Sequence, residues 1–213
     1  RKHNREGGND IDRVYSIYSG GDDLFFVGSW DAMPELALQI RNDLIRFTGG
    51  HKGVHASAGI ALVGGKYPFY QAAEDAHDAL EQSKGNGKNA VTFLGQTTKW
   101  GTFADNIKPQ MNVLVDLVKQ KQKGVPRALL TRLEQFYLQY AKRESDLKDR
   151  GEDVEQVLWG PWHWQSAYFL KRMAERGKAK DEINQVHEKL SGDNFRAIEW
   201  IGLAARWAAL LTR

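Results

Sequence analysis

Residues 14–28 read VYSIYSGGDDLFFVG and place two adjacent acids at the tip of a predicted β-hairpin. Val, Ile, Tyr and Phe on both sides are typical of strands, and paired glycines permit the positive φ angles of a tight turn. Adjacent acids within a strand point to opposite faces, whereas at a turn Asp22 and Asp23 can both face one cation. Because Mg²⁺ is commonly held by one or two carboxylates together with substrate phosphates, the stretch predicts a metal and nucleotide site. An ordinary exposed turn is the alternative, and the apolar flanks disfavour it because they place the acids at the rim of a buried sheet.

The composition of the 213-residue chain excludes several classes of protein. Because the chain has no cysteine, thiol catalysis and cysteine-ligated zinc are excluded, and a reducing compartment is favoured. No apolar run approaches the roughly 20 residues that cross a bilayer, so we expect a soluble, cytoplasmic protein without a membrane partner. The polar residues 1–10 begin without Met and predict a loop inside a longer polypeptide, of which this chain is a fragment.

The first part of the chain alternates predicted helices and strands after the hairpin. Apolar spacing of three and four residues predicts one helix from the acid-led start at Asp31 to Phe47 and another over 68–84. Residues 55–63 form a predicted strand whose small residues indicate close packing, and residues 90–94 form the last predicted strand. This order is typical of the second half of an α+β, palm-like domain.

Beyond Gly95 the pattern predicts helices only. They are marked by apolar residues near 114–118, 129–140, 154–173 with an interruption at Gly160-Pro161, and 195–211. We therefore expect two domains, 1–95 and 96–213, the second an all-α helical bundle.

The two predicted domains differ in charge: residues 96–213 carry 20 Lys and Arg against 15 Asp and Glu, whereas residues 1–95 carry 10 Lys and Arg against 12 Asp and Glu. Contacts with a polyanion outside the nucleotide site are therefore expected on the helical domain, although a solvated helical surface explains the excess about as well.

Two lysines four residues apart, Lys84 and Lys88, lie at the end of the second predicted helix. Lysine at a helix C-terminus usually does no more than complement the helix dipole. Because the paired acids lie in the same domain, contact with a bound triphosphate is the better interpretation.

These motifs resemble a known family. Tyr18-Ser-Gly-Gly-Asp-Asp-Leu-Phe25, Ser57-Ala-Gly-Ile60 and Lys84-x3-Lys88-Asn89 are similar to the GGDEF/cyclase-type palm of nucleotidyl cyclases. The closer resemblance is to the large, palm-bearing signalling subunit of type III-A CRISPR effector complexes. It is carried by Ser-Gly-Gly-Asp-Asp, Val27-Gly28-x-Trp30-Asp31, Lys66-Tyr67-Pro68, Trp100 and Trp207-x4-Thr212-Arg213.

The resemblance implies a ferredoxin-like palm, here its second half, followed by the C-terminal helical domain. It also implies an activity: ATP is converted to cyclic oligoadenylates, with release of pyrophosphate, when target RNA is bound. The implied partners are other effector subunits including the small helical subunit, guide RNA, target RNA and ATP. A fragment of this kind is expected to be inactive alone.

The same resemblance assigns roles to seven residues. Two Mg or Mn ions would be held at Asp22 and Asp23, the catalytic acids, and the nucleotide would be contacted by Ser19, Gly20, Gly21, Lys84 and Lys88. A further metal-binding acid is expected upstream of Arg1, and His77, where related helices often carry Asp, receives no role. Two alternatives stay open: a diguanylate-cyclase-like enzyme, disfavoured because Asp23-Leu24 replaces Glu-Phe, and a non-catalytic nucleotide-binding scaffold.

Other candidate residues are weaker. His51 and His55 have a spacing that metal ligands use on a helix, but they flank a predicted turn and strand. Tryptophans could stack on bases, yet such clusters usually belong to a core, and we predict core positions for Trp159, Trp162, Trp164, Trp200 and Trp207.

Overall fold

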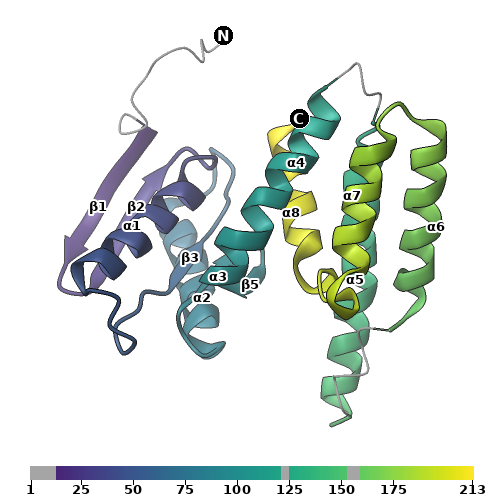
Figure 1. The fold of residues 1–213 in the computed structure, drawn as a ribbon. Helices are drawn as coiled ribbons and strands as arrows, with labels where there is room; N and C mark the ends of the chain where they lie inside the picture. Colours follow the sequence, from purple (N-terminus) through teal and green to yellow (C-terminus); the bar gives the residue numbers. More distant parts are fainter. Residues whose placement is uncertain (1–12, 121–124, 153–158) are drawn as a thin grey trace. The chain divides into compact units, whose positions relative to one another are not determined.

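The computed structural model describes residues 13–120, 125–152 and 159–213. The chain divides into two compact units, residues 1–100 and residues 101–213 (Figure 1). The first contains all the described strands, and the second is helical. The chain is therefore α+β, but its strands extend beyond the predicted domain end at residue 95. Within the described residues every helix is too short or too polar to span a bilayer.

The predicted hairpin is present as β1 (Val14–Gly20) and β2 (Asp23–Gly28), which pair antiparallel. Gly20 pairs with Asp23, so the turn has Gly21 and Asp22 at its centre. Gly21 has φ +63°, whereas Gly20 does not adopt a positive φ, so one glycine rather than two meets the demand of the turn.

The apolar side chains of the hairpin are largely exposed, which contradicts the expected buried sheet. Tyr15 is 76% exposed and Tyr18 56%, and β1 and β2 pair only with each other among the described strands. An isolated pair of strands cannot bury both of its faces. The alternation of strand-forming residues predicted the pairing correctly but not the burial.

Helix α1 (Met33–Phe47) starts with Pro34 in its first turn, where the missing N–H of proline is tolerated. Ala32, the N-cap residue, makes no side-chain capping hydrogen bond. The carboxylate of Asp31 instead accepts hydrogen bonds from the hydroxyl of Ser29 and the guanidinium of Arg13. Partial burial alone would raise the pKa of Asp31, but these two hydrogen bonds, a main-chain hydrogen bond and the charge of Arg13 together outweigh it and hold the pKa below its usual value.

A second sheet contains β3 (Ala58–Ile60), β4 (Ala90–Phe93) and β5 (Gln96–Lys99), in the order β3-β4-β5. Strands β3 and β4 are parallel, and β4 and β5 form an antiparallel hairpin whose turn has positive φ at Leu94 and Gly95. The strand expected over residues 55–63 is shorter than predicted. Strand β5 was not predicted, because Gln-Thr-Thr-Lys lacks an apolar alternation.

Helix α2 (Phe69–Gly85) packs directly against β3 and β4. A Cβ atom at Gly59 would lie 2.2 Å from the main-chain nitrogen of Leu80, so only glycine allows this contact. Buried hydroxyl groups add a second connection. Ser83 donates to the carbonyl oxygen of Ala58 at 2.7 Å, and Thr92 lies 2.8 Å from the hydroxyls of both Ser83 and Thr97. The close packing that small residues predicted at this strand is confirmed.

The second unit contains α4 (Lys108–Lys119), α5 (Ala128–Asp149), α6 (Pro161–Arg176), α7 (Lys180–Ser191) and α8 (Ile198–Leu211). Helix α4 continues from α3 (Trp100–Thr102) through a π-helical turn η2 (Phe103–Ile107), and the 3₁₀ turn η4 (Asp193–Phe195) precedes α8. Helix α7 was not predicted. Helix α6 starts at Pro161, and residues 154–158 of the helix predicted there lie outside the described residues.

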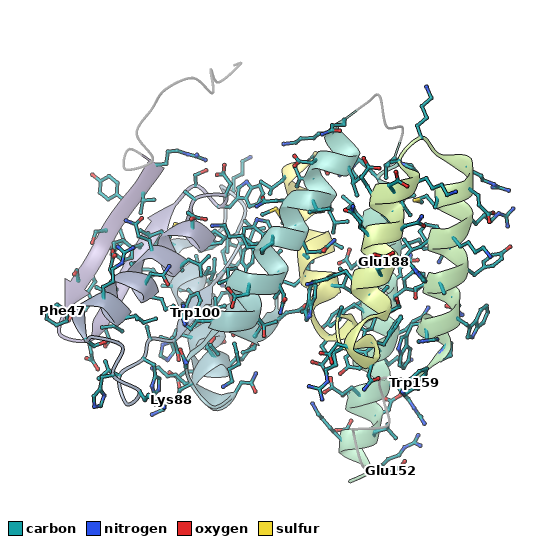
Figure 2. All side chains as sticks on the ribbon, viewed as in Figure 1. Phe47, Lys88, Trp100, Glu152, Trp159 and Glu188 are labelled. Carbon is teal, nitrogen blue, oxygen red and sulfur yellow. The ribbon has the colours of Figure 1, made fainter. Side chains whose placement is uncertain are left out.

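The core of this unit surrounds α8, which packs on α4 and α5. Trp200, Trp207 and Trp162 are buried, as predicted. Trp159 and Trp164 are 64% and 62% exposed, so the core prediction for these two residues is wrong (Figure 2 labels Trp159). On α6, Trp164 lies about 200° around the helix from the buried Trp162 and therefore faces the opposite side.

Candidate functional site

The two acids lie at the open tip of the β1–β2 hairpin. Asp22 is the second central residue of the turn and Asp23 the first residue of β2, and both are exposed. A Cβ atom added at Gly21 would meet no heavy atom within 4 Å. The tip therefore leaves space in which a ligand can approach the main chain and both carboxylates.

Lys84, in the last turn of α2, lies within electrostatic reach of the hairpin acids. Its ammonium group forms an ion pair with Glu81, with 2.8 Å between Nζ and Oε1. This hydrogen bond raises the pKa of Lys84 above its usual value, and the negative charges of Asp23 and Asp22 add to the rise. The fold thus brings together the acids and one of the two predicted lysines, which are about 60 residues apart in the sequence.

Lys88 follows α2 in a turn of unusual backbone conformation. Gly87, Lys88 and Asn89 have φ of +78°, +54° and +49°, and the N–H of Lys88 donates to the carbonyl oxygen of Lys84 at 3.1 Å. Figure 2 shows the Lys88 side chain projecting from the ribbon. Within residues 13–120 its ammonium group forms no hydrogen bond or ion pair, so it can accept an anionic ligand.

A third lysine, which the sequence analysis missed, contacts this turn. Lys99 of β5 donates from Nζ to the carbonyl oxygens of Asn86 at 2.7 Å, Gly87 at 3.1 Å and Lys88 at 2.9 Å. A lysine in a polar segment carries no local signal of this contact. Only the antiparallel pairing of β5 with β4 brings it to the turn.

The other predicted site residues have simple surroundings. Ser19 pairs with Leu24 next to the turn and is exposed, and Gly20 lies against the ring of Tyr18, whose hydroxyl would be 3.0 Å from a Cβ atom added at position 20.

His51 and His55 line a cavity of about 170 Å³ beside α1. The Nδ1 atom of His51 accepts the N–H of Gly53 at 3.1 Å, which occupies one of its two possible metal-binding nitrogens.

The donor set at the hairpin fits part of a magnesium site. Two adjacent carboxylates supply hard oxygen ligands, and Mg²⁺ completes its shell with water and substrate phosphate oxygens. Over residues 13–120, 125–152 and 159–213, no group of three or more His, Asp or Glu could hold a metal ion. Asp22 and Asp23 alone are two carboxylates, so a metal ion at the hairpin would need further ligands from outside these residues.

Comparison with known proteins identifies the first unit. Residues 3–92 match the family described as Cas10/Cmr2, second palm domain. The subtype III-A single-strand-specific deoxyribonuclease Cas10/Csm1 of Thermococcus onnurineus is 35% identical over an aligned stretch of 203 residues, which covers 87% of this chain and 22% of that protein. The Cas10/Csm1 of Mycobacterium tuberculosis is 38% identical over 158 residues, 74% of this chain and 17% of that protein.

A relative from a Cmr system matches a shorter stretch. The Cmr subunit Cmr2 of Pyrococcus furiosus is 35% identical over 92 residues, 41% of this chain and 10% of that protein. The chain thus spans between a tenth and a quarter of the length of these relatives. The matching palm motifs, the hairpin with its paired acids and the matches to Cas10/Csm1 that continue into the helical unit show that the chain belongs to the Cas10 family of type III CRISPR systems.

Proposed function

We propose that the first unit forms part of a cyclase-like nucleotidyltransferase site that converts ATP to cyclic oligoadenylate when the effector complex has bound target RNA. The observation that supports this proposal is that Lys84, in the last turn of α2, lies within electrostatic reach of Asp22 and Asp23 at the tip of the hairpin. Carboxylates for a cation next to ammonium groups for phosphates are the arrangement that phosphoryl transfer needs, because the protein contributes position and charge neutralisation.

Each of these residues has a distinct role in the proposal. Asp22 and Asp23 would hold Mg²⁺ or Mn²⁺, which when bound neutralises charge on the reacting phosphate. Lys84 exchanges its exposed partner Glu81 for a phosphate oxygen, and Lys88 binds a second one. Water and salt screen an exposed ion pair and make it weak, so a triphosphate can displace Glu81.

The Gly21 turn lets the nucleotide come close to the backbone, and Ser19 lies next to it. In the reaction a ribose 3′-oxygen bonds to the α-phosphorus of a second ATP. The bond from that phosphorus to the bridging oxygen breaks and pyrophosphate leaves. The proton of the 3′-hydroxyl passes to solvent, since no described residue is assigned as a base.

Analysis of labelled nucleotide products tests this function. The assembled complex, containing the full-length protein, is incubated with labelled ATP or GTP, with and without target RNA, and the products are separated by thin-layer chromatography. Cyclic oligoadenylates formed only with target RNA support the proposal. Cyclic dinucleotide formed from GTP would point to the diguanylate-cyclase alternative, and nucleotide binding without any product to the scaffold alternative.

The Cas10/Csm1 relatives are named for a different chemistry, single-strand-specific cleavage of DNA. This chain covers only 10% and 22% of the length of two of these proteins, so the named activity can belong to a part of them that this chain does not match. Cleavage of labelled single-stranded DNA is therefore measured in the same complexes. We expect replacement of the hairpin acids to leave DNA cleavage intact. Loss of cleavage together with loss of nucleotide products would contradict the assignment of the hairpin to nucleotidyl transfer alone.

We further propose that the helical unit docks other effector subunits and lies near the guide–target RNA. An exposed row on α6 supports this role. Trp164 is 62% exposed and Tyr168 61%, and Arg172 lies 5.9 Å from the ring of Tyr168. Exposed aromatic side chains beside arginine are enriched at interfaces with proteins and single-stranded nucleic acids.

A further inference from the structure

The turn that carries Lys88 is held in a conformation that its sequence does not favour. Three successive residues, Gly87, Lys88 and Asn89, lie in the left-handed region. Glycine adopts this region freely and asparagine often, but lysine rarely does, because its Cβ approaches the following carbonyl oxygen. Such a conformation persists only where surrounding contacts determine it.

Lys99 supplies those contacts. Its ammonium group has three N–H donors, and each has a carbonyl partner in the turn: Asn86 at 2.7 Å, Gly87 at 3.1 Å and Lys88 at 2.9 Å. These hydrogen bonds are charge-assisted and therefore stronger than bonds between neutral groups. The left-handed turn directs three successive carbonyl oxygens towards a single cation.

The strand that carries Lys99 is itself fixed at this place. Lys99 pairs with Ala90 in the β4–β5 hairpin, and the N–H of Trp100 donates to the carbonyl oxygen of Asn89 at 3.4 Å. The indole Nε1 of Trp100, a fully buried side chain, donates to the carbonyl oxygen of Ala56 at 2.9 Å. Strand pairing and the contacts of Trp100 therefore fix the main chain from which Lys99 reaches the turn.

We propose that Lys99 is a positioning residue: it holds the left-handed turn so that Lys84 and Lys88 present their ammonium groups together to a triphosphate. This inference rests on the proposed function of the hairpin acids and deepens it. Lys99 itself contacts no substrate, because its three donors already have partners within the turn. It acts through Lys88, whose main-chain N–H donates a hydrogen bond to the carbonyl oxygen of Lys84.

A simpler role would be to cap the C-terminus of α2, where a cation complements the helix dipole. Helix α2 ends at Gly85, with Asn86 as its C-cap residue. Two of the three carbonyls that Lys99 binds belong to Gly87 and Lys88, which lie beyond the cap. The contacts are thus centred on the turn rather than on the helix.

The first experiment measures the turn without any nucleotide. Amide hydrogen exchange is followed in the full-length protein for Lys99→Met, Lys99→Arg and the control Lys66→Met, which removes another exposed lysine of the same unit. We expect Lys99→Met to speed exchange of the Lys88 amide by at least about tenfold, since the charge-assisted contact with the Lys88 carbonyl oxygen is lost. Lys99→Arg should restore much of the protection, because a guanidinium also donates to several carbonyls, and Lys66→Met should leave it unchanged.

The second experiment measures ATP turnover by the assembled complex. We expect Lys99→Met to raise KM for ATP by about tenfold with little change in kcat, as for loss of a phosphate contact. In a Lys88→Ala background, Lys99→Met should add little, because the residue through which it acts is already missing.

The outcomes separate the two proposals. Faster exchange at Lys88 with an unchanged KM would show that Lys99 only caps the helix, and additive effects of the two variants would show that Lys99 does not act through Lys88. Unchanged exchange in Lys99→Met would overturn the positioning role directly. If the wild-type complex converts no ATP, the proposed function fails, and the exchange result still decides whether Lys99 holds the turn.

Discussion

The main-chain N–H of Lys88 donates to the carbonyl oxygen of Lys84 at 3.1 Å, so the two lysines predicted to bind phosphate are joined through the backbone. A helix would place residues four apart on one face as well, but here the chain has already left α2 at Gly85. The left-handed turn keeps the two residues adjacent while it redirects the chain into β4. Binding of phosphate by this pair is therefore sensitive to backbone geometry as well as to the side chains.

Replacing Asp22 and Asp23 together with Ala should abolish ATP conversion, by at least about a hundredfold, because both oxygen ligands for the metal are lost. Binding of target RNA should be unchanged. The measurement is product formation by the assembled complex, with Asp43→Ala as a control that removes an exposed acid of α1. Equal synthesis by the double variant and the control would contradict the assignment.

Glu81→Gln should strengthen ATP binding, because Lys84 loses the carboxylate that it contacts at 2.8 Å. We expect KM to fall by about two- to fivefold at low salt and less at high salt, because salt screens the attraction between exposed charges. Lys84→Ala should instead raise KM. A Glu81→Gln variant with weaker ATP binding would indicate that Glu81 belongs to the site rather than competes with it.

Asp31 should make the stability of the first unit depend on pH in the acid range. Its pKa is lowered in the folded state, so the carboxylate stabilises the fold above its unfolded pKa of about 3.9 and loses this effect as pH falls through the folded value. Thermal unfolding of the wild type and Asp31→Asn should therefore differ at pH 7 and pH 5, and the difference should shrink below about pH 4. A constant difference down to pH 2 would mean that the hydrogen bonds to Arg13 and Ser29 do not depend on the charge.

The hydroxyl groups of the buried Ser83 and Thr92 and the half-buried Thr97 should contribute unequally to stability. Ser83 donates its single proton to the carbonyl oxygen of Ala58, so it accepts from Thr92, which in turn accepts from Thr97. Thr92→Val removes both the donor to Ser83 and the acceptor for Thr97, whereas Thr97→Val removes one donor only. Urea denaturation should show a loss of about 2 kcal/mol for Thr92→Val and about 1 kcal/mol for Thr97→Val. The reverse order would contradict this direction of the hydrogen bonds.

The helical unit should gain protection from hydrogen exchange when the effector complex assembles. We expect the change over Arg127–Arg150 and Arg172–Lys189, and over the α6 row of Trp164, Tyr168 and Arg172. Trp164→Ala should weaken subunit assembly or RNA-coupled activation by about tenfold, as for a modest interface hot spot, and leave the hairpin acids unaffected. If neither region gains protection, the docking role is wrong.

Turn residues and the spacing of apolar residues made much of the secondary structure of the first unit predictable from the sequence. The turn at Gly21-Asp22 and helix α2, observed over Phe69–Gly85, follow from turn residues and apolar spacing. Helix α7 had a comparable signal in Ile183, Val186 and Leu190, which are three and four residues apart and all buried. That helix could have been predicted from the sequence.

Other features depend on partners distant in the sequence. Strand β5 is polar, and only its pairing with β4 defines it. The contact of Lys99 with the left-handed turn follows from that pairing, so no local pattern indicates it. Trp162 and Trp164 differ in burial because two residues on a helix face opposite sides, and composition alone does not show which side is covered. The roles of the acids and lysines as ligands stay predictions.

The contact between Gly59 and α2 determines which substitutions this unit can tolerate over evolution. Helix and strand meet through main-chain atoms, with a position for Cβ at Gly59 only 2.2 Å from the nitrogen of Leu80. Side chains on the outer face of α2 can therefore vary without shifting Lys84. A single methyl group at position 59, in contrast, would displace the whole helix, and with it Lys84 in its last turn and Lys88 just beyond its end. A position that tolerates almost no change is thus one that carries no functional group.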